Sequence, residues 1–232
     1  MKQCELLEKT VDDLDLSNIK VTEFKVLPVD FQTVKGFIKK WHYLGDAPLN
    51  ISLVFGLYYK QNLIGAMIYG SLSMLNTYKK YGDSQDSIIE LKRLCCIDKT
   101  KKNTESYFIS RTLKFIKNYT KYKTVVSYSD PFYNHLGTIY KASNFLHKGF
   151  TAKSKVIKWK DKFYHDKALR CKDSHNKLKP FTYEIKEALQ LGQATYIHKP
   201  PKHIYCYEIK RKNDEIPRSK SLQYNQMEFG LT

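Results

Sequence analysis

The chain has 232 residues, 42% of them hydrophobic and 14% aromatic, which is enough for a packed core and argues against a disordered protein. Its 40 Lys and Arg residues against 23 Asp and Glu give a formal net charge of +17. Such a balance indicates a polyanionic partner, nucleic acid before an anionic membrane surface; a lysine-rich surface without a partner is the alternative.

The apolar runs are too short for a signal peptide or a membrane span, and the longest covers residues 62–69. We therefore expect a cytoplasmic protein that does not enter the membrane. The five cysteines lack C-x-x-C spacing, so neither a disulfide framework nor a zinc knuckle is predicted.

Hydrophobic periodicity predicts an N-terminal segment (1–20), one α/β domain (21–210) with a basic C-terminal part, and a polar, frayed tail (211–232). In chain order, the expected strands cover 21–27, 51–59, 63–69, 88–97, 124–128, 155–159, 162–169 and 204–209. Helical spacing of apolar residues is found over 31–41, 107–119, 137–144 and 181–191, with Asn103 or Thr104 as the cap of the second helix.

This order of elements resembles the GNAT acyltransferase superfamily. The resemblance implies a mixed central sheet flanked by helices, and it extends to Tyr140-Lys141-Ala142-Ser143-Asn144-Phe145, where Asn144 takes the place of a usual glycine. In that superfamily the tyrosine matching Tyr140 commonly protonates the departing thiolate of coenzyme A. The phosphate-binding loop of the superfamily contains glycines, whereas residues 101–106 here contain none.

Four blocks resemble the Mom family of phage DNA-modification proteins more closely. They are Trp41-His42-Tyr43, Glu90-Leu91-Lys92-Arg93-Leu94, Asn103-Thr104-Glu105-Ser106, and Ser127-Tyr128-Ser129-Asp130-Pro131 with His135-Leu136-Gly137-Thr138-Ile139-Tyr140. The resemblance implies conversion of adenine to an N6-carbamoylmethyl-type adenine in double-stranded DNA, inside a bacterial host cell, which protects the DNA from restriction. The resemblance also implies two possible cofactors, acetyl-CoA and iron.

The predicted catalytic residues are His42, Tyr43, Arg93, Ser106, Asp130 and Tyr140. Arg93 could bind a phosphate or a donor carboxylate, because a charge in a buried strand must be paired or functional. Its alternative is a structural ion pair, although Arg93 and Glu90 have opposite parity on the strand. Asp130 could act as a base or a metal ligand, or it could cap the turn that follows.

Cofactor binding is predicted for Lys102, Asn103, Thr104 and Ser106 at the start of a helix, where backbone N–H groups attract anions. His42, Asp130 and His135 could form a two-His, one-carboxylate site for ferrous iron. His42 and Tyr43 could instead be an aromatic pair that closes a helix.

Modification of a duplex base requires that the base be flipped into a pocket, and aromatic side chains are expected to line it. The candidates are Tyr43, Tyr69, Tyr128 and Phe132. DNA phosphates are expected to contact Lys155, Lys158, Lys160, Lys162 and Arg170 in the basic C-terminal part. Two other functions stay open: N-acetylation of a protein or small amine with acetyl-CoA, and DNA binding without catalysis.

Overall fold

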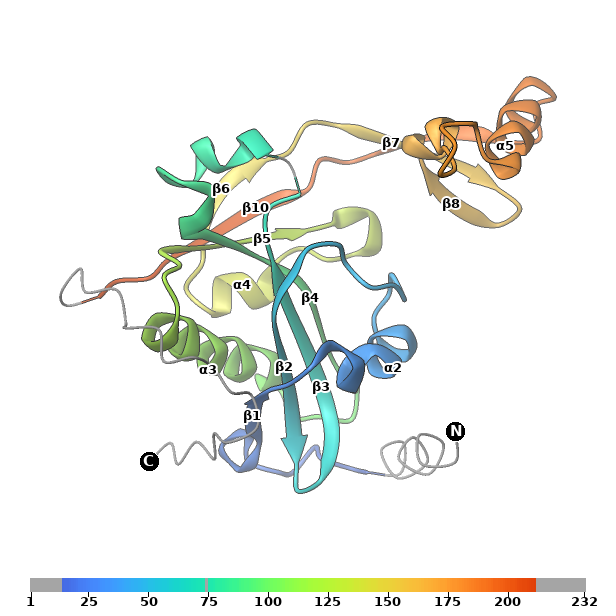
Figure 1. Cartoon of the computed structure of the whole chain (residues 1–232). Coiled ribbons are helices and arrows are strands. Elements are labelled where there is room, and N and C mark those ends of the chain that lie inside the picture. The colour runs from blue at the N-terminus through green and yellow to red at the C-terminus, as the bar shows by residue number, and fades with distance from the viewer. Residues whose placement is uncertain (1–13, 74, 212–232) are drawn as a thin grey trace. The chain divides into compact units, whose positions relative to one another are not determined.

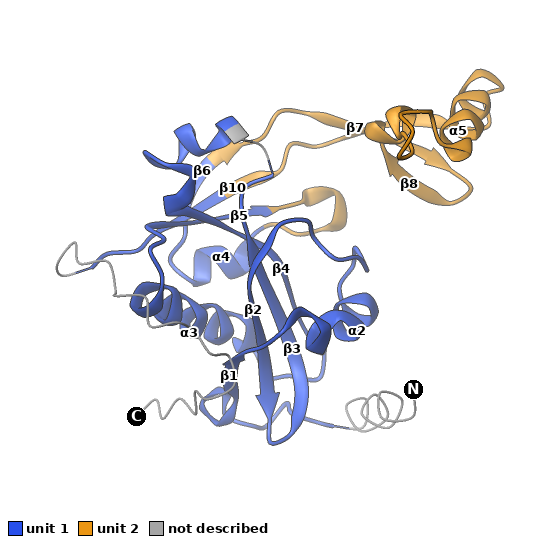
Figure 2. Cartoon of the chain, viewed as in Figure 1, with its two compact units in different colours: residues 1–128, 137–148, 205–232 blue, residues 129–136, 149–204 orange. Residues whose placement is uncertain are grey.

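The computed structural model describes residues 14–73 and 75–211 (Figure 1). In this described part, no helix is long and apolar enough to cross a membrane. Two compact units make up the chain where the sequence predicted one domain over 21–210 (Figure 2). Unit 1 comprises residues 1–128, 137–148 and 205–232, and unit 2 comprises 129–136 and 149–204.

A seven-stranded mixed sheet forms the main framework, with strand order β1-β2-β3-β4-β5-β10-β6. Strands β1 to β4 pair antiparallel, and β4 pairs parallel with β5. The bounds are β1 Lys25–Pro28, β2 Ile51–Tyr59, β3 Asn62–Gly70, β4 Ile88–Cys96, β5 Thr124–Ser129, β6 Leu146–Phe150 and β10 His203–Glu208.

Helices cover both faces of this sheet because each strand of its centre is apolar on both sides. Helix α2 (Phe31–Trp41) places Val34 and Ile38 against Ile68 on one face. Helix α3 (Thr104–Tyr119) contributes to the larger core on the other face, around the fully buried Tyr69 and Phe108. The short α4 (Thr138–Ala142) follows β5, and the predicted class of a mixed sheet flanked by helices is confirmed.

Unit 2 has its own small core. Strands β7 (Ser154–Trp159), β8 (Lys162–His165) and β9 (Thr195–Lys199) form a sheet in the order β8-β7-β9. Helix α5 (Pro180–Gln190) packs Ile185 and Ala188 with Ile157 and Trp159 of β7. Short 3₁₀ helices complete the chain at Val21–Glu23, Leu75–Lys80, Gln85–Ser87, Pro131–Tyr133 and Asp166–Arg170.

Several predicted bounds are corrected. The strand expected over 21–27 begins only at Lys25, after a 3₁₀ turn. The strand expected over 162–169 ends at His165, whose Nδ1 accepts a hydrogen bond from the Lys167 N–H and starts another 3₁₀ turn. Helix α3 begins at Thr104 rather than 107, and its N-cap Asn103 has a left-handed backbone (φ 77°). Strands β6 and β9 were not predicted, because both are largely exposed and lack an apolar alternation.

The two ends also differ from expectation where they are described. Leu16, from the predicted N-terminal segment, is fully buried, and its N–H donates to the Lys99 carbonyl (3.1 Å). Arg211 was assigned to the frayed tail, yet its guanidinium donates to the carbonyls of Lys117, Thr120 and Tyr122 at the end of α3. The rest of the predicted tail, 212–232, and residues 1–13 lie outside the described residues.

Candidate active site

The centre of the seven-stranded sheet contains an irregularity at β4. The β4–β5 register joins Ile88 to Thr124 and continues to Leu91 and Ser127. Opposite β3, Ile68 faces Arg93 while Tyr69 faces Leu91, so Lys92 is an extra residue and β4 bulges there. Bulges of this kind redirect side chains, and polar groups gather around this one.

Glu90 and Lys92 form an ion pair beside the bulge. The Lys92 Nζ lies 3.3 Å from the Glu90 carboxylate, and the Lys92 side chain is only 4% exposed. The same ammonium donates to the Ser73 hydroxyl (3.3 Å). Because a buried charge requires a partner, the pair provides a fixed anion and cation in the middle of the sheet.

Three tyrosines face this pair. Tyr81 and Tyr128 share a hydrogen bond between their hydroxyls (3.1 Å). Burial, together with the charge of Glu90, raises the pKa of Tyr81, Tyr128 and Tyr140. A hydrogen bond with the Ser127 side chain partly offsets this rise for Tyr140. All three hydroxyls therefore remain protonated at neutral pH and can donate protons. We call Glu90, Lys92, Tyr81, Tyr128 and Tyr140 the bulge cluster.

Tyr140 is positioned by α4. The N-cap of this helix is Gly137, whose backbone is left-handed (φ 75°) and which lies directly against the Tyr205 ring, leaving no room for a Cβ atom. The ring of Tyr140 packs on Tyr205 and Phe145, with centroids 5.3 and 5.6 Å away. The Tyr140 hydroxyl is thereby directed toward Ser127 and Glu90.

Arg93 pairs with Asp46. The bulge offsets the opposite parity of Glu90 and Arg93, because their partners on β3, Gly70 and Ile68, lie on the same face of the sheet. The Arg93 guanidinium donates to the Asp46 carboxylate (3.0 Å), the Asp46 carbonyl (3.4 Å) and the Lys92 carbonyl (2.9 Å). These contacts support the alternative of a structural ion pair. They hold the loop between α2 and β2 against the bulge.

His42 and Tyr43 lie at the start of that loop. The buried His42 is the C-cap of α2, and its Nδ1 accepts a hydrogen bond from the Leu44 N–H (3.2 Å). Its ring stacks on Tyr43 at 4.5 Å, while Tyr43 itself is exposed. The structure therefore contains the aromatic pair that closes the helix. Of the four aromatics expected to line a base pocket, Tyr69 is excluded, because it is fully buried and bonded to Thr112 (2.7 Å).

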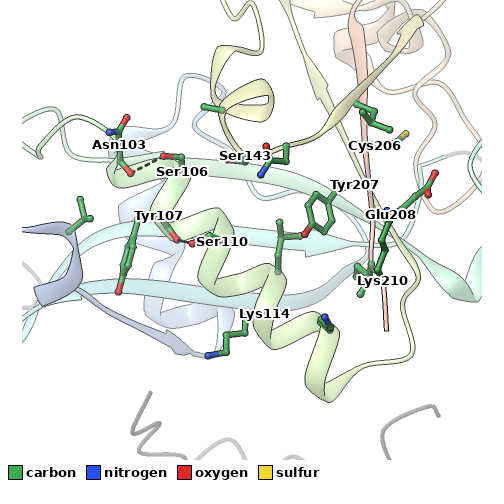
Figure 3. Close-up of a pocket in the computed structure, with 17 residues that line it drawn as sticks. Asn103, Ser106, Tyr107, Ser110, Lys114, Ser143, Cys206, Tyr207, Glu208 and Lys210 are labelled. Atoms are coloured by element: carbon green, nitrogen blue, oxygen red, sulfur yellow. Dashed lines mark hydrogen bonds between the residues drawn. The ribbon is translucent and has the colours of Figure 1, made fainter. Parts of the chain in front are cut away.

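A cavity of about 790 Å³ lies in unit 1 between α3, the end of α4 and β10 (Figure 3). Its polar lining comes from Ser106, Ser110 and Lys114 of α3, Ser143 and Asn144 after α4, and Lys210 after β10. The Ser143 hydroxyl is buried and has no hydrogen-bond partner in the described part of the chain. Glu208 also lines the cavity, and burial raises the pKa of the neighbouring Cys206 thiol to about 11, which keeps it protonated.

Two of the four predicted cofactor residues line this cavity and two do not. Asn103 and Ser106 line it, and the Ser106 hydroxyl donates to the Asn103 carbonyl (3.0 Å). Thr104 is fully buried, and its hydroxyl bonds the Lys101 carbonyl (2.6 Å). Lys102 is exposed and is not among the lining residues. Part of the predicted loop thus faces a cavity, together with lysines of α3 that were not predicted.

Asp130 lies in unit 2 and is only 3% exposed. One carboxylate oxygen accepts the Phe132 N–H (3.1 Å), the turn cap considered from the sequence, and the other lies 2.9 Å from the Lys199 Nζ and 3.1 Å from the Lys202 Nζ. Burial acts to raise the pKa of Asp130, but the two lysines outweigh it and the pKa is lowered. The carboxylate is therefore ionised and already bonded, which makes it a weak base.

The Lys199 side chain is itself 9% exposed and sits between aromatic rings. Its Nζ lies 4.5 Å from the centroid of Phe132 and 4.6 Å from that of Tyr133. Cation–π contacts of this kind stabilise a desolvated ammonium group. Lys199 therefore links β9 to the segment that carries Asp130.

A metal site finds no support in the described residues. Across 14–73 and 75–211, no three His, Cys, Asp or Glu side chains gather closely enough to hold a metal ion. Of the predicted ligands, Asp130 binds two ammonium groups and His42 Nδ1 binds a backbone N–H. His135 contributes its backbone N–H to the Asp130 carbonyl (3.2 Å). These residues do not fit an iron-binding role.

The basic residues predicted to bind DNA are on the surface of unit 2. Lys155, Lys158, Lys160 and Lys162 are exposed, whereas Arg170 pairs with Asp166 (3.1 Å). Unit 2 as a whole contains 13 Lys and Arg against 6 Asp and Glu, a formal net charge of +7. It therefore has the charge that a polyanion requires.

The site residues that the sequence analysis did not predict lie mostly far along the chain from their partners. Lys199 and Lys202 flank Pro200-Pro201, and this stiff, doubly basic segment was the available signal. Tyr81 sits in a polar loop, and nothing in the sequence connects it to Tyr128. Lys114 and Lys210 carry no motif.

Comparison with known proteins gives one family match. A model of the Mom protein family matches residues 23–229. No curated protein matches the chain.

Several of the similar solved structures are acetyltransferases. Arabidopsis thaliana NAA60 in complex with a bisubstrate analogue has a TM-score of 0.49 and 8% identity, over 80% of this chain and 97% of that one. The ribosomal-protein-S18-alanine N-acetyltransferase of Escherichia coli has a TM-score of 0.45 and 6% identity, over 83% and 98%. Identities this low say nothing about a shared substrate.

Proposed function

Because the chain belongs to the Mom protein family, we propose that it is a transferase that modifies adenine in double-stranded DNA, forming an N6-carbamoylmethyl-type base that protects the DNA from restriction. The match over residues 23–229 is the observation that carries this proposal. The net charge of +17 supports a DNA substrate, and the cavity and the bulge cluster supply a place for the chemistry.

The cavity is the proposed site of the group donor. Its volume of about 790 Å³ suits a ligand of cofactor size. Lys114, Lys117 and Lys210 make the lining basic, and Ser106, Ser110 and Ser143 add hydroxyl groups, so a phosphorylated donor such as acetyl-CoA fits it. When bound, acetyl-CoA would supply two carbons through its thioester, which alone gives an N6-acetyl base; a carbamoylmethyl product needs in addition a reactant that supplies the amide nitrogen and an oxidant for the methyl carbon. Glu208 also lines the cavity, and its carboxylate repels anions. The phosphates of the donor are therefore expected away from Glu208.

Tyr140 is the proposed general acid. Ala142, the last residue of α4, and Ser143 after it line the cavity, whereas Tyr140 itself is not a lining residue and its hydroxyl is hydrogen-bonded to Ser127. The Tyr140 hydroxyl is protonated at neutral pH, as a general acid requires, although burial raises its pKa and makes it a weaker acid than an exposed tyrosine. Glu90 and Lys92 then provide fixed charges next to the acid, where adenine N6 has to lose a proton as its new bond forms.

Mass spectrometry of nucleosides from plasmid DNA tests this function. Cells would express the wild type, Tyr140→Phe, Asp130→Ala or the surface control Lys35→Gln. We expect a new adenine-derived nucleoside with the wild type and Lys35→Gln, and at least a hundredfold less with Tyr140→Phe, since general acids typically contribute 10²–10⁴-fold. Its mass shift identifies the transferred group.

The other outcomes separate the remaining functions. Ordinary nucleosides from all four samples, with soluble protein, would contradict DNA modification. Acetyl-CoA turnover on a simple amine without DNA would then indicate an N-acetyltransferase. Tight DNA binding without turnover would indicate a binding protein.

A further inference from the structure

The loop between α2 and β2, residues 42–50, can be followed in Figure 1. It exposes three large apolar side chains. Leu49 is 83% exposed, the highest value among the large hydrophobic residues described, and Tyr43 and Leu44 are 47% and 40% exposed. Single exposed leucines are common on protein surfaces, but three such side chains on one short loop form a feature that calls for a partner.

This loop is held at several points. The left-handed Gly45 donates its N–H to the His42 carbonyl (2.8 Å), and Arg93 binds Asp46 through both its carboxylate and its carbonyl. Pro48 is buried next to Leu49, and the Asn50 carbonyl accepts the Ser71 N–H (3.1 Å). Leu49 is therefore presented from a fixed backbone, and its exposure is not a consequence of a loose loop.

Cations flank the loop. Lys39 and Lys40 occupy the last turn of α2, immediately before His42, and both are exposed. An apolar tip beside ammonium groups matches a DNA duplex, in which phosphates line the edge of a groove and stacked bases lie inside it.

We infer that Leu49 is a wedge that enters the base stack and fills the space left by the flipped adenine, with Lys39 and Lys40 on the adjacent phosphates. This role rests on the proposed function, because only an enzyme acting on a paired base must open the duplex. Extruding a base costs a few kcal/mol, and apolar side chains inserted between base steps compensate for lost stacking. Arg93 is on this view a positioning residue, which holds the loop through Asp46.

A fluorescence experiment tests the wedge directly. The modified adenines are first mapped in plasmid DNA from cells that express the wild type. A duplex with 2-aminopurine at one mapped position then reports unstacking, since its fluorescence rises when the base leaves the stack. We expect a rise with the wild type, with the apolar Leu49→Met, and with Leu191→Ala, a control at an exposed leucine (62%) of unit 2. Leu49→Ala should lose most of that rise.

Modification rates supply a second readout. On the normal duplex, Leu49→Ala should be slower by about tenfold, equivalent to roughly 1.4 kcal/mol. On a duplex with an abasic site opposite the target adenine, where extrusion is easier, the variant should recover to within about threefold of the wild type.

The failures are distinguishable. If the wild type modifies adenine and Leu49→Ala flips 2-aminopurine as well as the wild type, the wedge is wrong and the function stands. If Leu49→Ala is equally slow on both duplexes, the leucine supports the fold rather than the flipped state, which also overturns the wedge. Absence of any modified base with the wild type overturns both.

Discussion

Asp130 shows how far a single residue can be interpreted from sequence. Its place at the end of a buried strand, before Pro131, predicted a polar role, and the structure gives it one. What could not be predicted is the pair of lysines, because Lys199 lies 69 positions away in a strand that has no apolar pattern. The distinction matters chemically, since a free carboxylate could act as a base and a doubly paired one supports structure.

The ion pair predicts a specific acid sensitivity. The pKa of Asp130 is lowered below its ordinary value of 3.8, so its pairing stabilises the folded state above about pH 4 and is lost as the pH falls through the lower, folded-state pKa. Thermal unfolding between pH 6 and 2 should show a steeper loss of stability at acid pH for the wild type than for Asp130→Asn. Equal acid slopes would contradict the pairing.

Removing Lys199 should destabilise unit 2 at neutral pH. Lys199→Met deletes a buried ammonium bonded to Asp130 and packed on two rings, and we expect a loss of about 2 kcal/mol, at the level of one broken partly buried charge pair. Lys158→Met, an exposed lysine of the same small sheet, should change unfolding by less than about 0.5 kcal/mol. Chemical denaturation of the two variants makes the comparison.

At the level of elements, long periodic segments were predictable and short exposed ones were not. Helix α2 has the predicted bounds because its apolar residues follow the helical period, and strand β2 has them because its continuous apolar run is bounded by the polar residues Asn50 and Lys60. Strands β6 and β9 were missed because their pairing, rather than a buried face, makes them strands. The candidate site follows the same rule: Tyr140 and Ser106 stand in motifs, whereas the cavity depends on α3 and β10 coming together.

Helix α4 gives a prediction about backbone geometry. Gly137→Ala places a Cβ within 2.3 Å of the Tyr205 ring and forces alanine into a left-handed conformation, so we expect at least about 2 kcal/mol of destabilisation and a displaced Tyr140. Gly192→Ala has the same left-handed conformation with open space around it and should cost only about 1 kcal/mol. Urea unfolding distinguishes them; similar losses would mean that the Tyr205 contact contributes nothing.

For the whole molecule, the charge distribution predicts how salt affects binding. Affinity for duplex DNA should fall steeply with salt and be nearly independent of sequence, since lysines contact phosphates. Replacing Lys155, Lys158, Lys160 and Lys162 by Gln should reduce the slope of log Kd against log salt by about 3 to 4, the amount expected for four lost phosphate contacts. Fluorescence anisotropy across a salt series provides the measurement.

A matched control keeps that test specific. Replacing four exposed lysines of unit 1, Lys25, Lys35, Lys60 and Lys80, removes the same charge from elsewhere. If both quadruple variants reduce the slope equally, general charge attracts the DNA and unit 2 has no special part in binding.

The path of the chain between β6 and β10 has a consequence for how such a protein can evolve. The chain leaves the large sheet after β6 and returns at β10, its neighbour in that sheet, and the Thr151 N–H bonds the Lys202 carbonyl (2.9 Å) where the two segments run together. The segment between Thr151 and Lys202 starts and ends at the same place. It can therefore be lengthened, shortened or exchanged without changing the strand order of the large sheet. The bonds from Lys199 and Lys202 to Asp130 and the contact between the Phe132 and Phe163 rings have to be kept. Recombination within this stretch could therefore give the same chemistry a new choice of target.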